Sequence, residues 1–316
     1  MNFPTANPTD WILAHRPARL AVDPFQPHGY FVEQERDATG ALVDSGVILL
    51  TNKECPWHCL MCDLWRHTLT ETVPPGAIPR QIEYAFAHFN RRPLQVKLYN
   101  SGSFFDPAAI PLADYPGIAR LLTDVRHVIV ESHPRLIGEK ALRLRDALEG
   151  SLEVALGLET VHPEILPRLN KRFDLGHFRR ASEFLRTARI GLRAFVLVKP
   201  PFMGESEAVD WAVRSAEFAY ACGATVVSLI PTRLGNGALE ALQAADDFAP
   251  PHLSTLERAL EAVLALGAGR VFADTWNLNL FSRCSLCAPA RAARLEQMNR
   301  TQEIIERVEC RSCGKH

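Results

Sequence analysis

The hydrophobic positions of this chain fall into short apolar runs that alternate with longer amphipathic segments. Such runs are typical of buried parallel strands, and apolar residues three or four positions apart are typical of helices that cover a sheet. The runs predict strands at residues 41–50, 95–99, 127–130, 152–158, 192–198 and 225–230, with 270–273 as a shorter seventh. Helices are expected at residues 80–89, 138–148, 175–188, 207–221 and 255–266, the last with a capping box of Ser254 and Glu257.

This alternation predicts an α/β fold, because parallel strands need right-handed crossover connections. Six core strands and a shorter seventh are too few for a closed eight-stranded barrel. We therefore expect a partial (β/α)6 TIM-like barrel with a C-terminal cysteine-rich extension.

The pattern also suggests how the chain is divided. Residues 30–35 and 41–50 flank Asp37-Ala38-Thr39-Gly40, which is typical of a hairpin turn. The alternation ends near Phe281, where cysteine pairs and a basic amphipathic helix over residues 290–309 follow. The expected parts are an N-terminal arm and hairpin (1–40), the partial barrel (41–280) and a C-terminal metal-binding extension (281–316).

Composition narrows the class of protein. The 316 residues are 47% hydrophobic, which is enough for a large core, and a net charge of −1 gives no general affinity for nucleic acid. No apolar run approaches the ~20 residues of a membrane span, and residues 1–5 lack the segments of a signal peptide. Seven of the eight cysteines stand in tight groups, as metal ligands do, so we expect a reducing cytoplasm rather than disulfides.

The chemistry is concentrated in the stretch Cys55-Pro56-Trp57-His58-Cys59-Leu60-Met61-Cys62, directly after an apolar run. Thiolates are the soft ligands of iron–sulfur clusters and zinc. A [4Fe-4S] cluster normally takes four cysteines, so three leave one iron open to a small molecule. Zinc needs four ligands, and His58 is awkwardly placed to be the fourth. We therefore predict that the loop holds a [4Fe-4S] cluster on Cys55, Cys59 and Cys62.

The cysteine spacing resembles that of the radical S-adenosylmethionine (SAM) superfamily. Within it, the chain most resembles the radical SAM subunit of archaeosine synthase, in the Elongator catalytic-subunit-like branch. The matching segments, in the family's order over roughly residues 45–285, are 98–106, 130–134, 157–160, 169–171 and 197–202. The chain departs from this family in its modest charge and in His133, where arginine is expected.

Polar residues at the ends of the expected strands fit this resemblance. Gly102 lets the backbone approach a ligand closely, and Glu131 and Glu159 end two strands, where a carboxylate can hold a ribose hydroxyl or an ammonium group. Taken alone, residues 100–103 are also an ordinary turn, and both glutamates are also candidates for surface ion pairs. The resemblance implies a SAM site formed by Met61, Asn100, Ser101, Gly102, Ser103, Glu131, Glu159 and Lys199.

Two of these assignments have open alternatives. Lys199 either binds the SAM carboxylate or the substrate, or is simply solvated. Met61 either packs on adenine or belongs to the core. Basic residues gather in 168–189 and 291–311, but interleaved glutamates leave RNA contact open.

The last part of the chain carries Cys284, Cys287, Cys310 and Cys313 as two CxxC pairs on either side of a helix. Paired CxxC groups predict a site with four ligands. A structural zinc ion and an auxiliary iron–sulfur cluster both fit the spacing. Gly314 after the last cysteine favours zinc.

The resemblance also implies a mechanism. An external donor of the flavodoxin or ferredoxin type supplies one electron, SAM bound to the cluster is cleaved, and the 5′-deoxyadenosyl radical abstracts hydrogen from the substrate. For the substrate it implies carbon–nitrogen bond cleavage on a lysine adduct of a deazaguanine in tRNA. A small-molecule or natural-product substrate is the main alternative, given the near-neutral charge. Further alternatives are SAM-dependent aminocarboxypropyl transfer and a non-catalytic metal-binding scaffold.

Overall fold

The computed structural model describes residues 7–315, so residues 1–5, with the prediction about a signal peptide, lie outside the described residues. Within residues 7–315, eight strands form one sheet in sequence order. The strands are β1 (Gly29–Arg36), β2 (Leu42–Leu49), β3 (Gln95–Tyr99), β4 (His127–Ser132), β5 (Ser151–Glu159), β6 (Gly191–Val198), β7 (Val226–Pro231) and β8 (Arg270–Ala273). β1 pairs antiparallel with β2, and all later neighbours pair in parallel.

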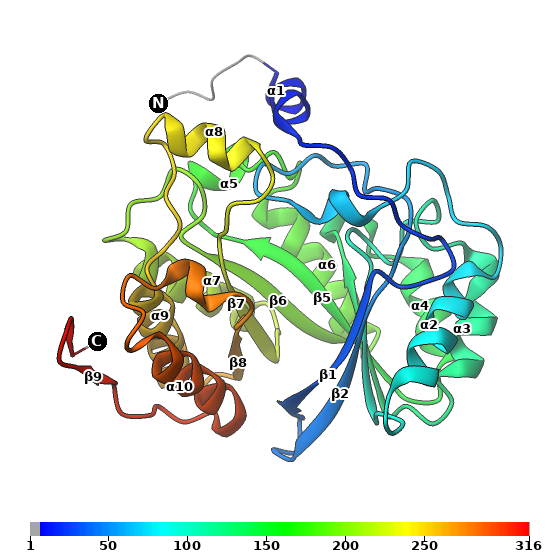
Figure 1. Ribbon diagram of the computed structural model, residues 1–316. Helices are drawn as coiled ribbons and strands as arrows, with labels where there is room; N and C mark the ends of the chain where they lie inside the picture. Colours follow the sequence, from blue (N-terminus) through cyan, green and yellow to red (C-terminus); the bar gives the residue numbers. More distant parts are fainter. Residues whose placement is uncertain (1–6, 316) are drawn as a thin grey trace.

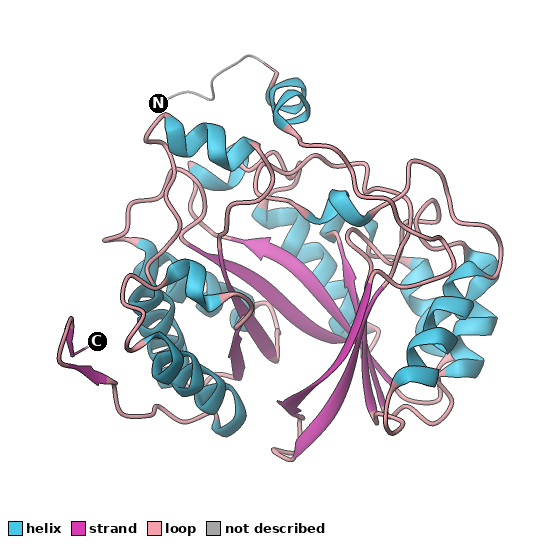
Figure 2. Ribbon diagram, in the orientation of Figure 1, coloured by secondary structure: helices cyan, strands magenta, loops and turns pink. Residues whose placement is uncertain are grey.

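Helices surround the curved sheet (Figures 1 and 2). They are α1 (Pro8–His15), α2 (Ala77–His88), α3 (Tyr115–Leu121), α4 (Glu139–Ala147), α5 (Ile165–Arg168), α6 (Leu175–Thr187), α7 (Ala208–Ala221), α8 (Ala238–Ala244), α9 (Leu253–Ala265) and α10 (Ala288–Thr301). Short 3₁₀ turns lie at Leu64–His67, Leu112–Asp114, Pro134–Leu136 and Leu278–Phe281, and a second sheet pairs β9 (Glu309–Cys310) with β10 (Gly314–Lys315). Figure 1 shows α2, α3 and α4 at one end of the large sheet and α7, α9 and α10 at the other.

This arrangement confirms the predicted α/β partial barrel with a cysteine-rich extension. The shorter seventh strand is present as β8, and the hairpin around residues 37–40 forms from β1 and β2. The antiparallel β1 belongs to the large sheet and extends it beyond the parallel core. The division of the chain into three parts stays a prediction.

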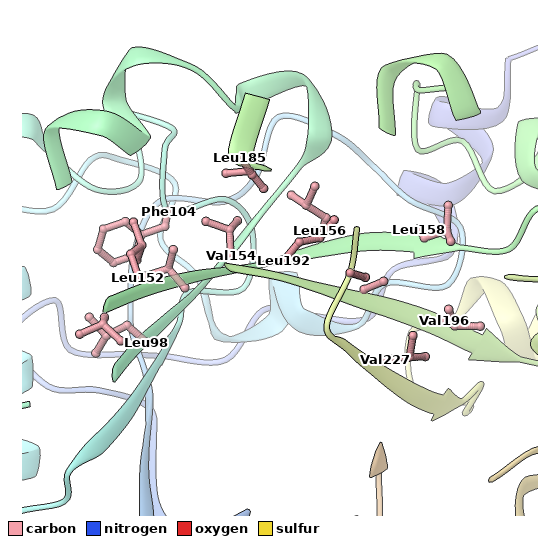
Figure 3. Close-up of a cluster of buried hydrophobic side chains, with 14 of the residues drawn as sticks. Leu98, Phe104, Leu152, Val154, Leu156, Leu158, Leu185, Leu192, Val196 and Val227 are labelled. Carbon is pink, nitrogen blue, oxygen red and sulfur yellow. The ribbon is translucent and has the colours of Figure 1, made fainter. Parts of the chain in front are cut away.

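The strands alternate between an apolar outer face and a more polar inner face. In β6, Leu192, Ala194 and Val196 pack in the main hydrophobic cluster, while Arg193 and Phe195 line the inner cavity. β3 repeats this pattern, with Val96 and Leu98 outside and Lys97 and Tyr99 inside. Figure 3 shows part of the outer cluster, with Leu98, Val154, Leu192 and Val196 among its labelled members. Period-2 alternation thus separates the core from the cavity.

A ring of charges lies inside the sheet near the start of the strands. Arg193 donates from Nε to Glu153 Oε1 at 2.7 Å and from Nη1 to Glu35 Oε2 at 3.0 Å. Lys97 pairs with the same Glu35 and, at 2.6 Å, with Glu33. These pairs satisfy buried charges that would otherwise be costly to desolvate.

Two helix boundaries differ from the predictions. The predicted capping box of Ser254 and Glu257 is wrong, because α9 starts at Leu253 with His252 as its N-cap, and Glu257 is buried against Arg291 instead. The helix predicted over residues 290–309 ends at Thr301, where Gln302 takes a left-handed conformation with φ of 59°. The first error arises because Glu257 pairs with Arg291, which is distant in sequence, and the spacing of Ser254 and Glu257 does not show this partner.

Candidate cofactor site

One large cavity of about 730 Å³ runs from the carboxyl ends of the strands into the barrel. It is lined by all three cysteines of the loop after β2, namely Cys55, Cys59 and Cys62. Cavities of this size hold small molecules and cofactors, and the carboxyl ends of parallel strands are where α/β barrels bind them. The cavity is therefore the candidate site.

The backbone of the cysteine loop is held in place by hydrogen bonds from two other loops. Leu60 N–H donates to Leu169 O at 2.9 Å, and Asn170 Nδ2 donates to His58 O at 2.8 Å. Asn236 Nδ2 donates to Leu60 O at 2.7 Å. The loops after β5 and β7 thus fix the loop that carries the thiols. The sequence analysis did not assign a role to either asparagine.

The three thiols are half-buried in the wall of the cavity. Burial is the largest cause that raises the pKa of each of Cys55, Cys59 and Cys62 to about 12. A metal centre would be needed to hold these sulfurs as thiolates, since thiolates are the ligand form.

The loop after β3 wraps around the carboxylate of Glu131. Asn100 N–H donates to Glu131 Oε1 at 2.5 Å, and the backbone N–H groups of Ser101 and Gly102 also donate to this carboxylate. Burial raises the pKa of Glu131, and these N–H groups only partly offset it. A Cβ atom on Gly102 would lie 3.2 Å from the Cβ of Cys55, so glycine permits the close approach of the two loops. Glu131 therefore shapes this turn from within.

Glu159 and Lys171 form a buried ion pair at the cysteine loop. Glu159 ends β5 with a φ of 65°, and strained conformations of this kind are frequent at functional sites. Burial pulls the pKa of Lys171 down, but Glu159 and then Cys59 outweigh it, and the net shift is upward. A Cβ atom on Gly157 would overlap both Lys171 Nζ and Glu159 Oε1, so a larger residue there would displace the ends of both side chains.

Lys171 is a candidate site residue that was given no role from the sequence, although it belongs to the matching segment 169–171. It lies in a loop after α5. Its carbonyl accepts a hydrogen bond from His133 Nε2 at 2.9 Å, and the His133 ring stacks on Trp57 with centroids 3.8 Å apart. Burial lowers the pKa of His133 to about 3, so this ring is neutral at physiological pH. A neutral stacked ring thus stands at the position where the resemblance led us to expect arginine.

The structure distributes the predicted SAM residues unevenly. Met61, Ser101, Gly102, Glu131 and Glu159 line the cavity, whereas Asn100, Ser103 and Lys199 are buried beside it. Ser103 Oγ lies 2.8 Å from Ser132 Oγ, and the side-chain amide of Asn100 has no hydrogen-bond partner within residues 7–315. Lys199 pairs with Glu205 at 2.8 Å, and Met61 also packs against the cluster of Ile165, Leu169 and Leu197. The roles of these residues stay predictions.

The cavity continues away from the cysteine loop toward β1 and β8. Phe31 and Trp276 face each other there, with ring centroids 5.1 Å apart, and Arg233 pairs with Asp274 at 2.8 Å. The charged residues Glu35, Lys97 and Arg193 line its inner end. The cavity thus offers room for a second molecule beyond a cofactor at the cysteines.

The last four cysteines form a second group. Their sulfur atoms lie within 4.8 Å of one another, and Cys284 Sγ is 3.9 Å from Cys310 Sγ and Cys287 Sγ 3.6 Å from Cys313 Sγ. The two predicted CxxC pairs are therefore brought together at one point.

Among residues 7–315, no helix has the length and apolar character needed to cross a membrane.

Comparisons with known proteins agree with this geometry. No family model matches the chain. An uncharacterized protein of Methanocaldococcus jannaschii is 26% identical over 94% of this chain and 87% of its own length. The archaeosine synthase subunit beta of Methanosarcina acetivorans is 26% identical over 69% of this chain and 66% of its own length.

Among solved structures, the archaeal Elp3 of Methanocaldococcus infernus is similar, with a TM-score of 0.52 and 11% identity. The match covers 71% of this chain and 59% of the Elp3 chain, and at this identity it shows the fold alone. The chain therefore shares the fold of this Elp3 and is a distant homologue of the archaeosine synthase subunit beta.

Proposed function

We propose that this protein is a radical SAM enzyme that binds a [4Fe-4S] cluster through Cys55, Cys59 and Cys62. The observation that carries the proposal is the placement of three thiols on one fixed loop, directly beside the Glu159–Lys171 pair in a 730 Å³ cavity. The distant homology to the archaeosine synthase subunit supports it.

The donor set fits such a cluster. Three soft sulfur ligands without a fourth cysteine on the loop leave one iron for a small molecule. When bound, the cluster and SAM supply a one-electron cleavage of the sulfonium that generates a 5′-deoxyadenosyl radical for hydrogen abstraction.

The residues of the cavity divide the work of holding SAM. Lys171 offers the cation for its carboxylate, and Glu159 offers an acceptor for its ammonium group or ribose. The backbone at Ser101 and Gly102 lies next to Cys55, where a methionyl group chelating the open iron would sit. Met61 presents an apolar surface for adenine.

For the substrate, homology favours carbon–nitrogen bond cleavage on a modified deazaguanine in tRNA, and a small-molecule or natural-product substrate is the second candidate. The near-neutral charge of −1 gives the second candidate its support, because RNA affinity normally draws on excess basic charge. The cavity beyond the cysteines has aromatic walls at Phe31 and Trp276 for a planar group in either case. An electron donor of the flavodoxin or ferredoxin type completes the proposal, with the cytoplasm as its compartment.

Product identity tests the reaction class. Anaerobically reconstituted protein, given SAM and dithionite, is expected to form 5′-deoxyadenosine and methionine, measured by liquid chromatography and mass spectrometry. Methylthioadenosine as the product would instead indicate aminocarboxypropyl transfer. Intact SAM beside a fully assembled cluster would support a non-catalytic scaffold.

Gly157→Ala is expected to weaken SAM binding by about tenfold or more, or ~1.4 kcal/mol, because the new methyl group displaces Lys171 and Glu159. Calorimetric titration of the reconstituted protein with SAM measures the effect. Gly138→Ala is the matched control, since its Cβ would meet nothing within 4 Å. Equal affinities of the two variants would show that the Glu159–Lys171 pair does not bind SAM.

A further inference from the structure

We propose that the last four cysteines hold one zinc ion, and that this ion seats α10 as a side wall of the cavity. The proposal concerns Cys284, Cys287, Cys310 and Cys313 together with the helix between the two pairs. It is independent of the chemistry proposed for the cavity, because it is tested by metal content and backbone protection.

The sulfur spacing matches a single tetrahedral ion. Zinc–sulfur bonds of about 2.3 Å place neighbouring sulfurs of a tetrahedron about 3.8 Å apart. Two separations, 3.9 Å and 3.6 Å, lie close to this value, and all four sulfurs lie within 4.8 Å of one another. A disulfide would need about 2.05 Å, and a four-iron cube spreads its thiolates over separate irons. The geometry therefore favours one zinc ion over an auxiliary cluster.

The backbone around the sulfurs forms two equivalent turns. Cys284 Sγ accepts hydrogen bonds from the N–H groups of Leu286 and Cys287, and Cys310 Sγ accepts them from Ser312 and Cys313. The second turn is closed by the short pairing of β9 with β10. Backbone donors of this kind stabilise metal-bound thiolates and orient them. The chain thus builds the site from two turns that are far apart in sequence.

The metal site is attached directly to α10. Cys287 is the N-cap of this helix, and Cys313 lies 26 residues further along the chain. The helix is also held by Arg291 and Arg294, which are buried against Glu257 and, at 2.5 Å, Glu261 of α9. An ion between the two turns therefore ties the start of α10 to the segment that follows it.

The other end of α10 covers the free edge of β8. Asn299 accepts from Ala273 N–H and donates to Ala273 O, both at 2.8 Å, and Gln302 makes the same pair of bonds with Val271. Two side-chain amides thus take the place of a neighbouring strand, so these backbone groups of β8 are not left open to pairing with another chain. In Figure 1, α10 lies next to β8 at the end of the sheet away from α2 and α3.

The same turn of α10 closes the cavity. Glu296, Asn299 and Arg300 line it, and Arg36 of β1 donates from Nε to Arg300 O at 2.6 Å. α10 therefore bridges β8 and β1, the two strands at the ends of the open barrel. Loss of the ion would release this wall and expose the edge of β8 to solvent.

The test compares wild-type protein as isolated, after chelation, and after return of zinc chloride, together with the Cys310→Ser variant. We expect about one zinc per chain in the wild type as isolated. Chelation should remove it and zinc chloride should restore it, whereas the Cys310→Ser variant should lack zinc before and after zinc chloride is added. Hydrogen exchange of the Val271 and Ala273 amides should rise at least about tenfold without zinc, while exchange in β4 stays unchanged. Cys222→Ser, outside the metal group, should change neither quantity.

A second variant separates the wall from the metal. Asn299→Ala should retain zinc and still raise exchange at Ala273. Iron in place of zinc after all three loop cysteines are replaced by alanine would overturn the assignment of the ion. Zinc loss without a change at Val271 and Ala273, or with an equal rise in β4, would overturn the role of the ion in seating the wall.

Discussion

Replacing Cys59 by alanine is expected to abolish reductive cleavage of SAM. Cys59 is the middle thiol of the loop and has the Lys171 ammonium group beside it. Two thiolates do not hold a four-iron cluster with an open site. Loss of a ligand should exceed the 10- to 100-fold effect of losing an outer-sphere partner, so we expect more than about a 100-fold loss of 5′-deoxyadenosine formation.

Iron analysis and visible absorbance give a readout that does not depend on turnover. The Cys59→Ala protein should take up little iron at this loop during anaerobic reconstitution and lack the charge-transfer bands of a cluster. Cys222→Ala is the matched control, because Cys222 ends α7 and does not line the cavity. A Cys59→Ala variant with normal iron and normal SAM cleavage would contradict the proposed function.

The sequence was informative where local patterns report directly on structure. Apolar runs such as those of β5 and β6 predict buried parallel strands, which the structure contains, whereas the soft metal site that the cysteine spacing predicts after β2 stays a prediction. The two CxxC pairs predict a four-ligand site, which the sulfur positions confirm as a cluster of four. In each case the residues that make the feature are close together in the chain or chemically distinctive.

The features that the sequence did not reveal depend on contacts between distant residues. Lys171 matters because Gly157 leaves room for its ammonium group, a relation that appears only when two loops meet. Asn299 and Gln302 look like ordinary polar helix residues until they meet the edge of β8. Side chains of this kind carry no local pattern, so only the assembled fold shows their roles.

Arg193 is the clearest example of a residue whose role depends on distant partners, because it lies inside an apolar run and yet neutralises two carboxylates. Its Glu35 partner is 158 residues away in sequence. Arg193→Met is expected to destabilise the protein by about 3–5 kcal/mol at neutral pH, because it leaves Glu153 and part of Glu35 buried without their guanidinium partner. Urea unfolding measures the loss. Arg186→Met, which removes an exposed pair with Glu183, should leave the midpoint unchanged.

The effect of Arg193→Met should depend on pH in a definite direction. Burial tends to raise the pKa of Glu153, but Arg193 and then His127 outweigh it and hold the pKa near 2 in the wild type. This carboxylate therefore stabilises the fold above its unfolded pKa of about 4.3, and the stabilisation is lost as the pH falls toward 2. Without Arg193, less positive charge opposes the effect of burial, so the pKa values of Glu35 and Glu153 are higher in the variant. Both carboxyls therefore take up protons at higher pH, and a neutral carboxyl group does not require a cation beside it. The stability gap between variant and wild type should thus narrow from pH 7 to about pH 4.5. A gap that stays constant over this range would show that lost packing, rather than unpaired buried charge, causes the destabilisation.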